Sequence, residues 1–160
     1  MNKKVILLSA VFFMISGIAV FSQENYFPDG YPPQAVLVAA YGGNMDLMKE
    51  ILATDIDRDV RDSLGGTALH VAVLSNHLEM ILLLLDYGFD VNAAVPPDGY
   101  EPLRGFTPLH YCVWTNNINA ANILLQYKAD KNIKAANGQT PVDKATREGK
   151  RDLLLLFARR

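Results

Sequence analysis

The chain has 160 residues, of which 50% are hydrophobic and 20% are charged. Its 15 basic and 17 acidic residues give a net charge of −2, so there is no excess of positive charge to neutralise phosphates, which argues against a nucleic-acid-binding protein. A single cysteine excludes a disulfide within one chain, so the stability of the fold must come from packing.

The first 22 residues differ from the rest and have the features of a secretory signal peptide. Lys3 and Lys4 give a basic start, residues 5–21 are almost wholly apolar, and Ser22 is a small residue where a signal peptidase could cut. We therefore expect residues 1–22 to be removed and the protein to be periplasmic or secreted. The basic start is similar to that of bacterial signals. An uncleaved anchor is the alternative, and only then would the protein be attached to a membrane.

After an N-terminal arm at residues 23–33, the chain repeats a short pattern. Three segments share it, TALHVA from Thr67, TPLHYC from Thr107 and TPVDKA from Thr140, and a weaker copy, QAVLVA, begins at Gln34. A period of 33 to 40 residues is typical of stacked supersecondary units. We predict a repeat domain over residues 34–160, with units at about 34–66, 67–106, 107–139 and 140–160.

Each unit contains the signals of two short helices. The threonines are N-cap residues for the first helix, and Pro108 and Pro141 stand at the first helical position, where a missing N–H costs nothing. An apolar stretch at residues 78–85 predicts the second helix, which Gly88 ends. Neither helix can bury its apolar side alone, so the units must stack.

This pattern resembles the ankyrin repeat, in which a Thr-Pro-Leu-His turn opens the first helix and Gly-Ala-Asp-Val-Asn follows the second. The resemblance covers about residues 31–158 and implies an all-α solenoid of about four helix-turn-helix units with β-turn fingers. One finger is lengthened, because seven extra residues fall within 93–105. The segment Pro-Pro-Asp-Gly at 96–99 predicts a turn there, so we expect the tip to point into solvent. Both neutral loop drift and added contact surface fit the sequence.

The histidines and the cysteine invite a chemical interpretation but fit a structural one better. The resemblance implies that His70 and His110 hydrogen-bond neighbouring turns, and that Thr67, Thr107 and Thr140 are structural as well. Cys112 stands where the other units have alanine, so we expect it to be buried. A catalytic cysteine needs a base and an exposed thiolate, and no ligands are spaced for a metal. We therefore predict no catalysis, no cofactor and no metal.

The best candidates for binding lie near the end of the first helix. Tyr41, Leu74 and Trp114 take the same position in successive units, and the resemblance implies that this position faces a concave groove. An exposed apolar row of this kind is typical of protein interfaces. The predicted partner-binding residues are these three, Ser75, Thr115 and Arg147 beside them, and Leu64, Tyr100, Arg104 and Phe106 at the fingers. Alternatively, the N-terminal arm covers part of the row.

The sequence thus predicts an exported, monomeric module that binds another protein through its groove and finger tips. Two further hypotheses remain, a membrane-tethered scaffold that keeps residues 5–21 and a secreted effector that acts on host proteins.

Overall fold

The computed structural model describes residues 14–15, 18–19 and 31–159. Most of the predicted signal peptide lies outside these residues. Four of its residues form a short antiparallel pair, in which β1 (Met14–Ile15) faces β2 (Ile18–Ala19). In the part of the chain that the structure describes, no helix is both long enough and apolar enough to cross a membrane.

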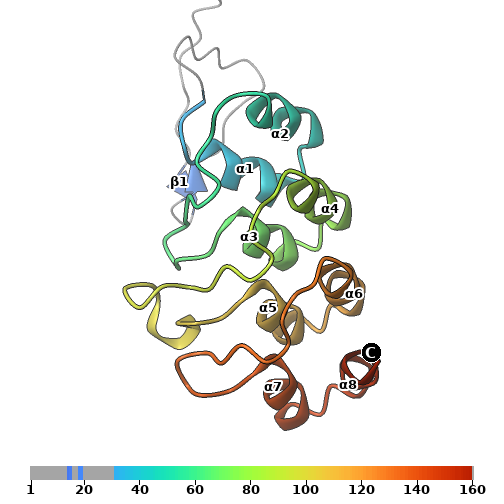
Figure 1. Ribbon diagram of the computed structural model, residues 1–160. Helices are drawn as coiled ribbons and strands as arrows, with labels where there is room; N and C mark the ends of the chain where they lie inside the picture. Colours follow the sequence, from blue (N-terminus) through green and yellow to red (C-terminus); the bar gives the residue numbers. More distant parts are fainter. Residues whose placement is uncertain (1–13, 16–17, 20–30, 160) are drawn as a thin grey trace, which may run out of the picture.

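Residues 31–159 form four pairs of α-helices, which confirms the predicted all-α solenoid. The first helix of each pair is here called the inner helix, and these are α1 (Ala35–Gly42), α3 (Ala68–Leu74), α5 (Pro108–Thr115) and α7 (Pro141–Arg147). The second is the outer helix, and these are α2 (Met45–Leu52), α4 (Leu78–Asp86), α6 (Ile118–Gln126) and α8 (Arg151–Ala158). The pairs stack in chain order, with inner and outer helices in separate rows (Figure 1).

The core runs between the two rows of helices and repeats from unit to unit. One position of each outer helix is at most 3% exposed, and it is held by Ile51, Leu84, Leu124 and Phe157. One position of each inner helix is small and at most 1% exposed, and it is held by Ala39, Ala72, Cys112 and Ala145. Helices this short are not stable alone in water, so the stacking of the units stabilises them.

The segments that join one pair to the next are called the first, second and third fingers. The second finger, between α4 and α5, exposes Pro97, Asp98 and Tyr100 at its tip, as expected, but the residues on either side of the tip pack against the rest of the protein. It contains a 3-10 helix (Glu101–Leu103), and Val95 and Leu103 are buried. Its backbone hydrogen-bonds to Leu64 of the first finger at 3.2 Å and to Ala136 of the third at 2.9 Å. The insertion therefore joins the neighbouring fingers.

The N-terminal arm is described from Tyr31 onward. The Tyr31 hydroxyl donates to Oε2 of Glu50 on the outer helix α2 at 2.6 Å, and this contact raises the pKa of Tyr31 to about 12. The described end of the arm thus lies against the outer row. The question whether the arm covers the inner helices concerns residues outside the described part.

Candidate functional site

Two buried histidines occupy the same place at the start of inner helices. Thr67 caps α3 and Thr107 caps α5, and the backbone N–H of each threonine donates to Nδ1 of His70 or His110 at 3.1 Å. A ring nitrogen that accepts this bond carries no proton, so the neutral ring holds its proton on Nε2. In α7 an aspartate takes the histidine's place and Thr140 is the cap.

The other nitrogen of each ring reaches the start of the following unit. Nε2–H of His70 donates to the carbonyl of Phe106 at 3.1 Å, and Nε2–H of His110 donates to that of Gln139 at 3.2 Å. Burial lowers the pKa of both histidines to about 4, because desolvation disfavours the charged ring. Both nitrogens of both rings are thus engaged within the protein, and the histidines hold one unit to the next.

Cys112 is fully buried in the row of small inner-helix residues. Burial raises the pKa of its thiol, because the apolar surroundings disfavour the thiolate. Within residues 31–159, the His, Cys, Asp and Glu side chains form no group of three or more that could hold a metal ion.

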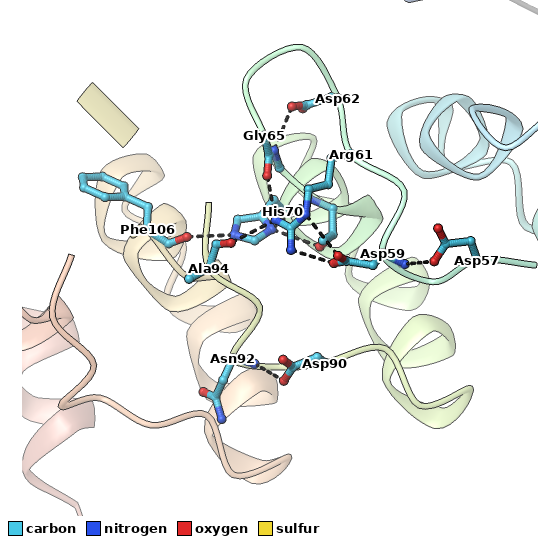
Figure 2. Close-up of polar contacts among 12 residues, drawn as sticks. Asp57, Asp59, Arg61, Asp62, Gly65, His70, Asp90, Asn92, Ala94 and Phe106 are labelled. Atoms are coloured by element: carbon cyan, nitrogen blue, oxygen red, sulfur yellow. Dashed lines mark hydrogen bonds and ion pairs between the residues drawn. The ribbon is translucent and has the colours of Figure 1, made fainter. Parts of the chain in front are cut away.

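The acidic residues that follow the outer helices are used by their own loops. In each finger an aspartate accepts a hydrogen bond from the backbone N–H two residues later at 2.8 Å, and these aspartates are Asp57, Asp90 and Asp130. Figure 2 shows the first two of these turns. The Asp-x-Asp and Asp-x-Asn signatures of the sequence therefore encode turns.

Arg61 connects the first finger to the second. Its Nη1 donates to the carbonyls of Gly65 and Ala94, each at 2.9 Å, and its Nη2 pairs with Asp59 at 2.6 Å (Figure 2). With its donors used in this way, the Arg61 guanidinium positions the two fingers relative to each other.

The exposed apolar residues of the inner helices form the strongest candidate for a binding surface. Tyr41 on α1, Leu74 on α3 and Trp114 on α5 are 54%, 40% and 47% exposed. They hold the same position in three consecutive inner helices, which pack side by side. We call these three residues the inner row.

The three inner helices that carry the inner row have no charged residues. The helices α1, α3 and α5 contain no Asp, Glu, Lys or Arg. Two of the outer helices beside them differ, since α2 carries Asp46, Lys49 and Glu50, and α4 carries Glu79 and Asp86, whereas the outer helix α6 has no charged residue either. Depletion of charge together with exposed aromatic residues is the composition of an interface centre.

Trp114 is held in place by a buried aromatic residue that the sequence analysis missed. The Trp114 ring meets the Tyr111 ring edge to face, with centroids 5.7 Å apart and planes at 80°. Tyr111 is 2% exposed and packs edge-on against His70 at 4.8 Å. A side chain fixed in this way loses little freedom on binding, which favours affinity.

The fourth unit adds positive charge at one end of the inner row. Lys144 is buried, pairs with Glu148 at 2.6 Å and lies 5.3 Å from the centre of the Phe106 ring. Arg147 has the position in α7 that Trp114 has in α5 and is exposed. It forms no ion pair with any residue of the described part. The inner row is thus followed by an available guanidinium.

Two of the predicted partner-binding residues need correction. Phe106 is 5% exposed and stacks on the His110 ring at 5.0 Å, so it belongs to the core. Ser75 is half-buried and its hydroxyl oxygen is fully buried, so it offers no group to a partner. Thr115 is exposed, although its hydroxyl donates to the Tyr111 carbonyl at 2.9 Å.

The remaining finger residues form a separate and weaker set. Tyr100 is 53% exposed, whereas Leu64 and Arg104 are half-buried, and Nε of Arg104 donates to the Gly99 carbonyl at 3.2 Å. The fingers precede the inner helices, whereas the inner row lies near the ends of those helices. The finger set and the inner row are therefore at opposite ends of the inner helices.

Comparison with known families matches this architecture. A family model described as ankyrin repeats (3 copies) matches residues 7–95 and residues 36–135. The chain belongs to the ankyrin repeat family. Repeats of this family are protein–protein interaction modules, and this sets the general class of function for the chain.

Individual relatives come from varied sources. The chain is 30% identical over 125 residues to an ankyrin repeat protein of Rickettsia bellii, which covers 77% of this chain and 65% of the relative. It is 33% identical over 116 residues to the mouse B-cell lymphoma 3 protein homolog, covering 72% of this chain and 22% of the relative. A fowlpox virus ankyrin repeat protein is 31% identical over 116 residues, covering 66% and 25%. The chain thus spans only part of the length of these relatives.

Proposed function

We propose that the protein is an exported module that binds another protein, with the inner row of Tyr41, Leu74 and Trp114 at the centre of the contact. The observation that carries the proposal is the exposure of these three side chains on helices that have no charged residues. Aromatic residues in such places supply much of the binding energy of protein complexes. Tyr100 adds contact surface at the second finger.

The module acts by binding and carries no catalysis of its own. The engagement of both ring nitrogens of His70 and His110 supports this, as does the burial of the Cys112 thiol. We expect the protein to work as a monomer.

Export is supported by the basic start and the apolar residues 5–21. The mass of the protein isolated from its own cells tests this, because removal of the signal leaves residues 23–160. A full-length mass in the membrane fraction would instead indicate a tethered scaffold. Recovery from the culture medium would indicate a secreted protein.

Affinity capture with matched variants tests the binding surface. The wild-type chain is compared with a Tyr41→Ala/Trp114→Ala double variant and with Leu155→Ala, which changes a residue 58% exposed on the outer helix α8. All three are first shown to be folded by circular dichroism and thermal unfolding. We expect one specific protein to be recovered with wild type and Leu155→Ala and lost with the double variant. Equal recovery with all three would contradict the proposal.

A further inference from the structure

We propose that the inner row accepts an amphipathic α-helix of the partner, laid across α1, α3 and α5, with an acidic side chain at the end that meets Arg147. This inference rests on the proposed function, because it assumes that the inner row binds protein and specifies what it binds.

The helices that carry the inner row have no charged residues. The three inner helices under the row offer no charged side chain, so a charged group of the partner placed over them would lose its hydration without gaining a counter-charge. The part of the partner that covers Tyr41, Leu74 and Trp114 must therefore be apolar.

The backbone groups of the partner need hydrogen-bond partners of their own. An extended segment binds well where a sheet edge offers N–H and C=O groups to pair with. The inner row lies on helices, whose backbone groups are already paired within each helix, so a strand placed there would leave its own groups unpaired. A helix satisfies its backbone internally and needs only side-chain contact.

The distance between neighbouring residues of the inner row matches the repeat of an α-helix. Packed helices lie about 8–10 Å apart, so consecutive members of the inner row are separated by about that distance. An α-helix rises 1.5 Å per residue, and residues seven apart lie on nearly the same side and about 10.5 Å apart. In a strand, neighbours on one face are about 6.6 Å apart, and the next pair is about 13 Å apart. Apolar residues at every seventh position of a helix match the step of the row.

A positive charge stands at the end of the inner row. Arg147 follows Trp114 at the next step, is exposed and has no ion-pair partner among the described residues, whereas its neighbour Lys144 is already paired with Glu148. A glutamate one further step along the partner helix would lie against Arg147. A contact of this kind fixes the direction of the helix more than it adds affinity.

Three synthetic peptides test the inference against the purified full chain by fluorescence anisotropy. The first is an alanine-based helix with three leucines spaced seven apart and a glutamate seven residues after the last. The second has the same composition with the leucines scrambled around the helix. The third keeps the order of the first but has prolines between the leucines, so that it is extended.

The inference predicts saturable binding of the first peptide and at least about tenfold weaker binding of the other two. Leu74→Glu weakens the binding of the first peptide at least about tenfold, and so does the milder change Trp114→Ala. Leu155→Glu on α8 leaves the affinity of this peptide unchanged. Arg147→Glu weakens it roughly threefold, and replacing the peptide's glutamate with lysine restores it. This restoration cannot come from a merely structural effect of the variant.

Several results would overturn the inference. The first peptide would show no saturable binding, or the scrambled peptide would bind as tightly as the first. A third such result is that the lysine peptide does not restore the affinity lost in Arg147→Glu. Tighter binding of the proline peptide in a manner that depends on Trp114 would also overturn it, yet would leave the inner row as a protein-binding surface. Failure of the proposed function is a different result, in which the captured natural partner does not depend on Tyr41 and Trp114.

Discussion

The imidazole of His70 donates from Nε2 to the carbonyl of Phe106 at 3.1 Å, and so joins the start of one inner helix to the residue that precedes the next. The same ring accepts the backbone N–H of Thr67 at Nδ1. Protonation of Nδ1 would replace this acceptor with a donor aimed at another donor. The link between units therefore requires a neutral histidine, and His110 makes the equivalent link to Gln139.

This requirement predicts that stability falls in mild acid. The folded pKa of His70 and of His110 is lowered from 6.5 to about 4, so below pH 6.5 the unfolded chain binds more protons than the folded chain. The contribution of the two neutral histidines to the free energy of unfolding is fully present above pH 6.5. It declines toward pH 4, by up to roughly 1.4 kcal/mol per pH unit for each histidine. Urea unfolding at pH 7.5, 6 and 5 measures this. An unfolding free energy that stays constant over this range would contradict it.

Leu124→Ala should be far more damaging to the fold than Trp114→Ala. Leu124 is completely buried, so its truncation should cost roughly 2–5 kcal/mol and unfold much of so small an array. Trp114 is 47% exposed and loses mainly its edge contact with Tyr111, which is about 1 kcal/mol. Thermal unfolding of both variants compares them. Equal losses would show that Trp114 is a core residue.

Lys128→Gly should stabilise the protein. Lys128 has φ of 65° at the end of α6, in the place where Gly88 has φ of 81° after α4. A residue with a Cβ is strained in this left-handed conformation, so glycine should add about 0.5–1 kcal/mol. Lys128→Ala is the matched control, since it removes the side chain and keeps the strain. A rise in melting temperature with alanine as large as with glycine would assign the effect to the lysine side chain instead.

Gly105→Ala should destabilise the protein more than Gly88→Ala. Both glycines have positive φ, but a Cβ on Gly105 would lie 2.8 Å from Cα of Ala135 and from N of Ala136 in the third finger. A Cβ on Gly88 would meet nothing within 4 Å, so only backbone strain of about 1 kcal/mol is expected there. Urea unfolding of the two variants measures the difference. Similar losses would mean that the contact between the second and third fingers adds little.

The fold could be predicted because its signals are local and repeated. A threonine cap opens three of the units, a proline follows it in two, and an aspartate turn follows the outer helix in the first three units. The structure has helices beginning after Thr107 and Thr140 at the prolines. The stacking of the units follows, because no unit can bury its apolar residues alone.

The predicted exposure of Phe106 was wrong, because the repeat is irregular at this place. Phe106 holds the position of Gly66 and Gln139 in the other units, so the pattern placed it at an exposed finger. The lengthened second finger makes room for an aromatic ring in the core at this one place, where Phe106 stacks on His110. The apolar Val95 and Leu103, on either side of the predicted turn, were the signal that the insertion would pack.

The burial of individual side chains near the ends of the inner helices was not evident from the sequence. Ser75 and Thr115 stand at the same position of their units, but Ser75 is half-buried and Thr115 is exposed. The contact of Tyr111 with Trp114 follows from their spacing of three residues on one helix. The packing of Tyr111 against His70 joins two units, and the pattern of a single unit does not show it.

The most direct test of the central claim is photo-crosslinking in the cells that make the protein. A photoreactive amino acid is placed at Leu74 in the inner row, and in a second strain at Leu155 on the outer helix α8, which is 58% exposed. We predict a discrete adduct with one other protein from position 74 and none from position 155. An adduct from position 155 alone, or no protein adduct from position 74, would contradict the assignment of the inner row as the binding surface.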